Sequence, residues 1–446
     1  MRARGRRLLL ADVHRGSGGH GVGYGMTLIR MRRVLLLGRV LSATVFFVPS
    51  RSALNTAVTE LESDDVRIVR PRSAAARALT ALWILAAPFR VGDPWLWVRR
   101  TFALMVTGPF YRALEHSTSL PRRVRRFLIR QGPFYQRLKA VSARYAAKSD
   151  AAWHAKYRTH VLEPFRALED AGRDTPGFRL RLPAEREGEA SRQAGRLGIR
   201  PDAPIVTVHV RESGYRTTGG LTQRGWDDIR NAHIEDFLPS FRALVERGYT
   251  VVRLGDPSMT PVTMPGVVDL ATSPDRNPWL DIWCTMRSRF LIGCDSGPSW
   301  LAVLLDLPVL TVNAVHFRDA SRATDRILCK LARDRHTGHL LSVSEMLTED
   351  FLRVGFKGDR YECVDNDPDD IQRAVVDMIE VIEGREQPSW SQRRFNRRLL
   401  EVDRQKLGAS SALEGVAVAG RARGTLSRRF ARSHFAPEDA SPPSTG

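Results

Sequence analysis

Short apolar runs alternate with helical patterns along the second half of the chain. Five runs rich in β-branched or apolar residues predict buried strands: Ile205–Val210, Thr250–Leu254, Val267–Leu270, Arg289–Gly293 and Val309–Val312. Apolar residues at helical spacing lie between them, over Ile234–Val245, Pro278–Met286 and Pro298–Leu305. Pro239 indicates that the first of these helices starts about one turn later than its apolar pattern. The alternation predicts a parallel sheet with helices on both faces.

The first half begins with a similar pattern. Strands are expected at Arg7–Val13, Thr44–Pro49 and Val66–Val69, with helices over Met26–Leu41 and Ala53–Leu61. This βαβαβ order is typical of the start of a second parallel sheet. From 73 to 168 the chain becomes helical and basic, and from Pro388 its composition shifts to Arg, Ser, Gly, Ala and Pro.

These patterns predict an α/β protein with two Rossmann-like, doubly wound domains, which 446 residues are sufficient to build. Residues 1–180 would form an acceptor domain with a basic helical insertion at about 73–168. Residues 181–385 would form a nucleotide-sugar domain. We expect residues 386–446 to be a basic tail that is largely disordered beyond Leu407.

Charge points to an anionic partner or to a well-solvated surface, and the sequence does not decide between them. Lys and Arg number 69 against 49 Asp and Glu, which gives a formal net charge of +20. In the basic insertion, aromatic residues such as Trp83, Phe102 and Tyr111 are interleaved with Arg. Such a face suits an anionic membrane surface, although aromatics packed inward with Arg facing water are commoner. No helix-turn-helix, RRM-like or zinc-finger pattern supports nucleic acid.

Several chemistries and locations lack their sequence signatures. The four cysteines, Cys284, Cys294, Cys329 and Cys363, form neither a zinc pattern nor a disulfide framework. The chain has no convincing export signal or membrane span, so we expect a cytoplasmic protein, peripheral to the inner membrane face if the basic insertion binds lipid. P-loop, GxSxG and HExxH motifs are absent, and Asp367-Pro368-Asp369 is better read as a helix cap than as a metal motif. We therefore expect no metal and no cofactor.

Polar residues follow the predicted strands of the second half at their carboxyl ends. Because these ends share one edge of a parallel sheet, the side chains should converge on one ligand site. The candidates are His209, Arg211, Tyr215, Arg253, Gly255, Asp256, Asp295, Ser296, Gly297 and Ser299, with Asp281 nearby.

The residue types at this edge indicate phosphate. Arg211 and Arg253 could neutralise a diphosphate through bidentate hydrogen bonds. Ser296-Gly297-Pro298-Ser299 precedes a helix with proline in its first turn, an arrangement that directs free N–H groups at an anion. Taken singly, each Arg could equally be part of a surface ion pair, and Ser296 could be an ordinary N-cap.

The ordered motifs over about 175–380 resemble a bacterial family of glycosyltransferases with the GT-B fold, distantly similar to fucosyltransferase-type and heptosyltransferase-type enzymes. The motifs are His209–Tyr215, Arg230-Asn231, Gly248–Asp256, Asp281-Ile282, Phe290–Gly293, Asp295–Gly297, Pro308 and Asn313. Part of the series is similar to the HxRRxD motif of GDP-fucose-dependent fucosyltransferases, in which Arg binds the donor phosphates. Glu212 and Gly214 depart from that motif, which argues against GDP-fucose as the donor.

The resemblance implies metal-independent transfer of a hexosyl or deoxyhexosyl group. A nucleotide-sugar donor would bind through the candidate residues above, and the acceptor would be a cell-surface glycan or a lipid-linked molecule. His20 or Asp281 would act as the base toward the acceptor hydroxyl. His20 lies in a glycine loop similar to the one that opens lipid-linked N-acetylglucosaminyl transferases.

Two other functions stay open. An anionic-surface or nucleic-acid binding protein would use the positive charge. A dinucleotide-dependent oxidoreductase would use Gly16, Gly18 and Gly21, which satisfy GxGxxG between a predicted strand and a predicted helix. The acidic residue expected about 20 positions later in a dinucleotide site is not evident.

Overall fold

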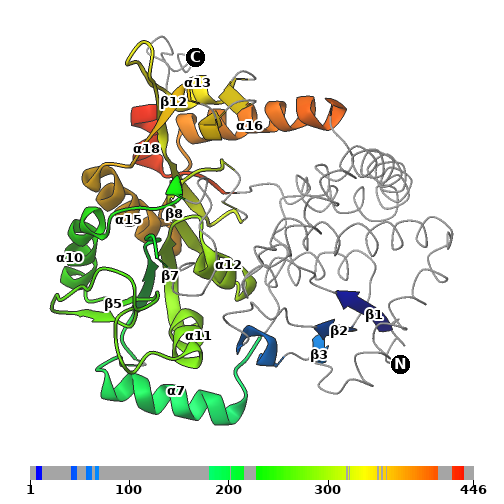
Figure 1. Cartoon of the computed structure of the whole chain (residues 1–446), viewed down its shortest axis with the longest axis vertical. Helices are drawn as coiled ribbons and strands as arrows, with labels where there is room; N and C mark the ends of the chain where they lie inside the picture. The colour runs from blue at the N-terminus through cyan, green and yellow to red at the C-terminus, as the bar shows by residue number, and fades with distance from the viewer. Residues whose placement is uncertain are drawn as a thin grey trace, which may run out of the picture. The chain divides into compact units, whose positions relative to one another are not determined.

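The structure is a computed structural model (Figure 1). It describes residues 7–12, 42–47, 57–62, 66–69, 180–200, 202–214, 228–317, 320, 322–348, 351–352, 355–357, 359–409 and 424–435. Contacts between residues divide the chain into two units. The first comprises Met1–Arg70, Gly172–Gln405 and Gly420–Gly446, and the second comprises Pro71–Ala171 and Lys406–Ala419. Apart from the last residues of one helix, every element below belongs to the first unit.

A seven-stranded parallel sheet organises the described residues (Figure 1). Its order is β13-β9-β8-β7-β4-β5-β6. The strands are β4 (Ile205–His209), β5 (Thr250–Arg253), β6 (Val267–Asp269), β7 (Ser288–Gly293), β8 (Val309–Ala314), β9 (Arg326–Cys329) and β13 (Thr425–Leu426). The chain moves outward from β4 through β5 and β6, then continues on the other side of β4 with β7, β8 and β9. The predicted α/β class and parallel sheet are confirmed.

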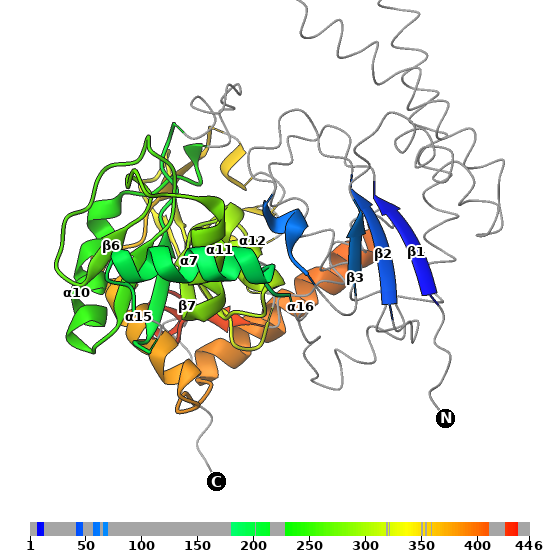
Figure 2. The ribbon, with the colours of Figure 1, turned by 90° about the horizontal axis from the view of Figure 1, so that it is seen from below.

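Helices cover both faces of this sheet (Figures 1 and 2). On one face α10 (Leu238–Glu246) packs against α15 (Pro368–Ile382), with the 3-10 helix η4 (Ile234–Phe237) beside both. On the other, α11 (Pro278–Arg287) packs against α7 (Ala184–Arg196) and contacts α12 (Gly297–Leu304). The α10 helix starts at Leu238 with Pro239 in its first turn, as Pro239 predicted.

The alternation of side chains along β4 determines on which face of the sheet each side chain lies. Val206 and Val208 are fully buried in the core shared with α10 and α15, whereas Ile205 belongs to the core that includes α7 and α11. His209 follows the same alternation as Ile205, so it lies on the face of α11 and α12. The position of His209 is therefore set by the two-residue period of the strand.

Smaller elements complete the described structure. Strands β1 (Arg7–Asp12), β2 (Ser42–Phe47) and β3 (Val66–Val69) form a parallel sheet in that order, and η1 (Ala57–Glu60) contacts α11. Strands β10 (Leu331–Asp334), β11 (Leu340–Leu341) and β12 (Tyr361–Val364) form an antiparallel sheet, with α13 (Val343–Met346) and η5 (Gly355–Lys357) nearby in sequence. The predicted strands of the first half are confirmed, and the two-domain organisation stays a prediction. The glycine loop, the helix at Met26–Leu41 and the basic insertion at 73–168 lie outside the described residues.

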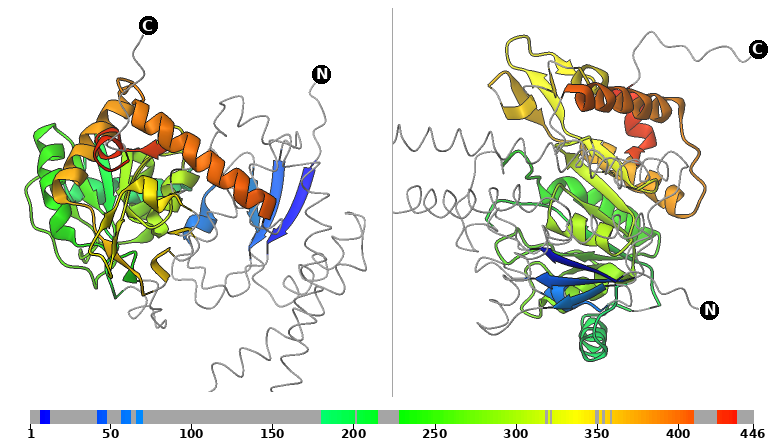
Figure 3. Two further views of the ribbon diagram at one scale, coloured as in Figure 1. Left: turned by 90° about the horizontal axis from the view of Figure 1, so that it is seen from above. Right: turned by 90° about the vertical axis from the view of Figure 1, so that its right-hand side faces the viewer.

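Two stretches of the basic tail form regular elements, and the second of them lies beyond Leu407, where we expected disorder. Residues 390–409 form the helix α16 (Trp390–Ala409), and residues 425–434 form β13 and α18 (Arg428–His434). Strand β13 pairs with β9, and the ring of Phe435, just after α18, lies 5.7 Å from that of Phe395 in α16. Figure 3 shows α16 in orange beside α18 in red. Phe395, Phe430 and Phe435 are at most 2% exposed, and burial of their rings outweighs the basic composition around them.

None of the helices that the structure describes combines the length and the apolar character that a membrane span requires.

We expect Phe430→Ala to lower the free energy of unfolding by about 3–5 kcal/mol, because it leaves a cavity in the core beneath α18. The exposed Arg432 on the same helix provides the control, and Arg432→Ala should change stability by about 0.5 kcal/mol or less. Urea denaturation of both variants measures the difference. Equal stabilities would show that α18 does not belong to the core.

Candidate functional site

The candidate site lies where the sheet order reverses, between β4 and β7. The chain enters the sheet at β4 and returns on its other side at β7, and the register places His209 of β4 beside Gly293 of β7. In open parallel sheets, ligands bind outside the carboxyl ends of strands at such a switch point. The sequence prediction that His209 and the 295–299 loop converge agrees with this register.

His209 is held as a neutral imidazole. Its side chain is buried, and its Nδ1 atom lies 2.9 Å from the Ser296 hydroxyl. The pKa of His209 is lowered from 6.5 to about 4, mainly by burial. The positive charges of Arg211 and Arg253 also lower the pKa, and their effect exceeds the opposing effect of Asp256. At neutral pH, His209 can therefore form a hydrogen bond with a ligand without adding positive charge.

The bond to His209 leaves the start of α12 without a side-chain cap. Ser296 occupies the N-cap position of α12, yet its hydroxyl makes no capping hydrogen bond because it faces His209. Ser299, in the first turn, donates to the Cys294 carbonyl at 2.8 Å. Because Pro298 has no N–H, the donors at the start of α12 are the N–H groups of Gly297 and Ser299, which lie at the positive end of the helix dipole, a suitable place for an anion.

Positive side chains surround this edge. Arg211 donates to the Asn231 Oδ1 atom at 2.8 Å, and Arg230 donates to the Asp295 carbonyl at 3.4 Å. Lys330 donates to the Asn231 carbonyl at 2.8 Å and pairs with Asp365. These bonds place three cations around the loop that precedes α12. Arg230 belongs to a motif in the resemblance. Lys330 was missed, although it directly follows β9 and the strand-end rule would have found it.

Arg253, which the sequence suggested as a diphosphate ligand, is buried and paired with protein carboxylates in the structure. Its side chain is 0% exposed and forms ion pairs with Glu212 at 2.6 Å and Asp269 at 3.1 Å. It also donates to the Thr260 carbonyl at 2.5 Å. Arg253 is the last residue of β5, and its partners on β6, on the loop after β4 and on the loop after β5 enclose its guanidinium. Its role is to hold Glu212 and the 256–262 loop.

Gly255 and Asp256 shape the loop after β5. A Cβ atom on Gly255 would come within 2.2 Å of the Met259 sulfur and 2.9 Å of Ala271, so the loop requires glycine here. The Asp256 Oδ1 atom accepts from the Ser258 N–H at 3.0 Å and from its hydroxyl at 2.5 Å. The Asp256 Oδ2 atom is buried without a hydrogen-bond partner in the described part of the chain.

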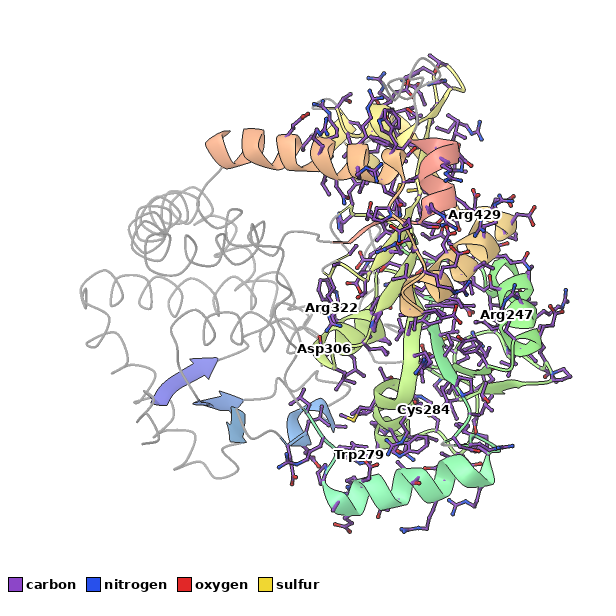
Figure 4. The ribbon with its side chains drawn as sticks, turned by 180° about the vertical axis from the view of Figure 1, so that it is seen from behind. Arg247, Trp279, Cys284, Asp306, Arg322 and Arg429 are labelled. Carbon is purple, nitrogen blue, oxygen red and sulfur yellow. The ribbon has the colours of Figure 1, made fainter. Side chains whose placement is uncertain are left out.

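Asp281 lies in the first turns of α11, the helix from which Trp279 and Cys284 are labelled in Figure 4. Asp281 as a whole is partly exposed, but its Oδ1 atom is buried and has no hydrogen-bond partner among the described residues. Burial raises the pKa of Asp281 from 3.8 to about 7, and Arg276 opposes the shift only in part. A carboxyl that titrates near neutral pH is suited to proton transfer. No described contact joins Asp281 to His209 or Ser296.

His20 and Tyr215 lie outside the described residues. In the part of the chain that the structure describes, no group of three His, Cys, Asp or Glu side chains is arranged to hold a metal ion. Asp367 accepts from the N–H of Asp369 as the N-cap of α15, which confirms the prediction of a helix cap at this position.

Comparison with known proteins finds no matching family model and no matching curated protein. The chain is similar to three solved structures, each 12% identical to it. The glycosyl transferase family 9 structure from Veillonella parvula DSM 2008 has a TM-score of 0.33 and covers 68% of this chain and 79% of its own. The iron-containing dodecameric glycosyltransferase TibC from enterotoxigenic E. coli H10407 has a TM-score of 0.26, and the match covers 69% of this chain and 58% of TibC. The structure of E. coli heptosyltransferase WaaC with ADP-2-deoxy-2-fluoro heptose has a TM-score of 0.28, and the match covers 69% of this chain and 88% of WaaC.

The buried Asp281 carboxyl predicts a change in the pH dependence of stability. Between pH 4 and 7 the folded chain keeps a proton on Asp281 that the unfolded chain has released, so this group makes the free energy of unfolding fall as pH rises. His209 contributes the opposite slope between about pH 4 and its unfolded value of 6.5. In wild type, the two effects largely cancel.

Asp281→Asn removes only the first effect. We expect the stability of this variant, relative to wild type, to increase by about 2 kcal/mol from pH 5 to pH 7. Urea denaturation at the two pH values measures this change. Asp275→Asn, which alters an exposed carboxylate just before α11, should show no such increase. Parallel pH profiles for Asp281→Asn and wild type would mean that Asp281 ionises normally.

Proposed function

We propose that the protein is a glycosyltransferase that uses a nucleotide-sugar donor. The single observation that carries this proposal is the uncapped start of α12, beside His209 at the point where the sheet order reverses. The ordered motifs of the sequence support it. In this proposal the donor diphosphate lies against the first N–H groups of α12.

The neighbouring cations would stabilise the leaving group. Transfer of the sugar leaves negative charge on the nucleoside diphosphate, and fixed positive charges that face this position lower the energy of the transition state. Arg211 is best suited to this role because its planar guanidinium can form two parallel hydrogen bonds with phosphate oxygens. Arg230 adds positive charge from the same edge, whereas the charge of Lys330 is paired with Asp365. These residues would supply the stabilisation that a divalent metal supplies in other transferases.

Glu212 does not oppose this binding. Its carboxylate accepts from Arg253 at 2.6 Å and from the Thr260 N–H and hydroxyl at 2.8 and 2.9 Å. The charge of Glu212 is thereby compensated within the protein, and the departure from the fucosyltransferase motif at this position has a structural reason. The edge stays positive through Arg211.

The remaining roles extend the same proposal. His209 would bind the donor as a neutral hydrogen-bonding group, and Asp256 would accept a hydrogen bond from a donor hydroxyl through its unpartnered oxygen. Asp281 or His20 would act as the base toward the acceptor. A hexosyl or deoxyhexosyl donor, a cell-surface glycan or lipid-linked acceptor, and a cytoplasmic location at the inner membrane face complete it.

Donor binding tests the proposal. A thermal-shift series with UDP-, GDP- and dTDP-sugars should raise the melting temperature of the wild-type protein with at least one of them, because a ligand bound to the folded state stabilises it. Arg211→Ala should lower the affinity for that nucleotide sugar by about tenfold or more, since it removes charge-assisted hydrogen bonds. Arg211→Lys should recover only part of the affinity, because it restores the charge without the planar fork.

Two control variants separate binding from stability. Arg333→Ala removes an exposed Arg on β10 and should leave donor affinity unchanged. Arg253→Ala should lower the melting temperature even without ligand, because it leaves two buried carboxylates uncompensated. The proposal is wrong if no nucleotide sugar shifts the wild-type protein at saturating concentration, or if Arg211→Ala binds the donor as wild type does.

A further inference from the structure

A second charged cavity lies at the opposite edge of the main sheet. It has a volume of about 650 Å³, within the range of ligand pockets. Its lining residues lie at the amino-terminal ends of β4, β5 and β7 and at the carboxyl ends of α10, α11 and α15: Asp202, Ala203, Pro204, Arg247, Tyr249, Arg287, Arg289, Ile379, Glu383 and Arg385.

Most of the charges in this cavity are already compensated. Glu383 accepts from Arg385 at 2.8 Å, and Arg287 pairs with Glu187 on α7. The second acidic residue of the lining, Asp202, pairs with Arg200 at 2.6 Å. These pairs account for both carboxylates that line the cavity and for two of its four guanidinium groups.

Two arginines of the cavity keep an uncompensated charge. Arg247, labelled in Figure 4, donates to the Ala243 carbonyl at 2.7 Å, which is a neutral acceptor. Neither Arg247 nor Arg289 has a carboxylate partner among the residues that the structure describes, and both are exposed to solvent. The cavity therefore carries two positive charges that are free to meet an anion.

Tyr249 lines the same cavity as the two arginines. Burial raises the pKa of the Tyr249 hydroxyl and Glu383 raises it further, while Arg289 and Arg247 both lower it. The hydroxyl stays protonated at neutral pH and can donate a hydrogen bond. Its ring is fixed by an edge contact with Phe290, with centroids 6.5 Å apart.

We propose that this cavity binds a phosphate-bearing anion through Arg247, Arg289 and Tyr249. Two guanidinium forks and one hydroxyl offer hydrogen-bond donors, and phosphate oxygens are acceptors that match them. The site is separate from the candidate donor site, because the five residues of β4 place the two edges roughly 13 Å apart with the sheet between them. The anion would be a second ligand, distinct from the sugar donor.

Calorimetric titration of the full-length protein with pyrophosphate at constant ionic strength tests the proposal. We expect two classes of site in wild type. The double variant Arg247→Ala/Arg289→Ala should lose one class, with affinity reduced by about tenfold or more. Arg211→Ala should affect only the other class. Arg242→Ala, an exposed substitution on α10 outside the cavity, should retain both classes.

The outcomes separate this site from the proposed function. If wild type shows only the class that depends on Arg247 and Arg289, and Arg211→Ala leaves the titration unchanged, the donor site is contradicted and this proposal stands. Identical titrations of wild type and the Arg247→Ala/Arg289→Ala variant would overturn it, and matching melting temperatures would exclude unfolding as the cause of a loss. A parallel assay with phosphatidylglycerol vesicles identifies the source of the phosphate. Vesicle binding that depends on Arg247 and Arg289 assigns a lipid headgroup, and pyrophosphate binding without it assigns a soluble compound.

Discussion

The hydrogen bond between His209 and Ser296 links the fold to the proposed chemistry. It crosses from β4 to the loop after β7, the two strands that adjoin where the sheet order reverses. Gly293 allows the loop to turn closely, because a Cβ atom there would come within 2.4 Å of the Ser299 hydroxyl. Since Ser296 bonds to His209, it does not cap α12, and the helix keeps its N–H groups for a ligand. A local choice of hydrogen-bond partner thus produces an anion site.

A buried ion network supports this edge from within the sheet. Arg253 pairs with Asp269 on the neighbouring strand and with Glu212 on the loop after β4. Removing one member of a buried ion pair usually costs about 3–5 kcal/mol, because the other charge is left without compensation. The network therefore fixes the loop that carries Arg211, next to Glu212, without contributing a charge to the ligand. Charges that hold the site and charges that face the ligand are distinct groups.

The sequence was sufficient for the parallel sheet and for part of the site, and particular residues show why it was insufficient for the rest. The β-branched runs and the strand-end rule placed His209, Arg211 and Ser296 together. The rule treated Arg253 in the same way, although Asp269 on β6 and Glu212 on the loop after β4 pair with it and bury it. Phe430 and Phe435 lie in a basic stretch whose composition resembles a disordered tail, and only their tertiary contacts reveal that they are core residues.

A crystal structure of the protein with a bound nucleoside diphosphate tests the central claim most directly. The account predicts that the diphosphate contacts the N–H groups at the start of α12 and the guanidinium of Arg211, with His209 still bonded to Ser296. A diphosphate bound at the Gly16–Gly21 loop instead, with the start of α12 free of ligand, would contradict it and favour a dinucleotide site.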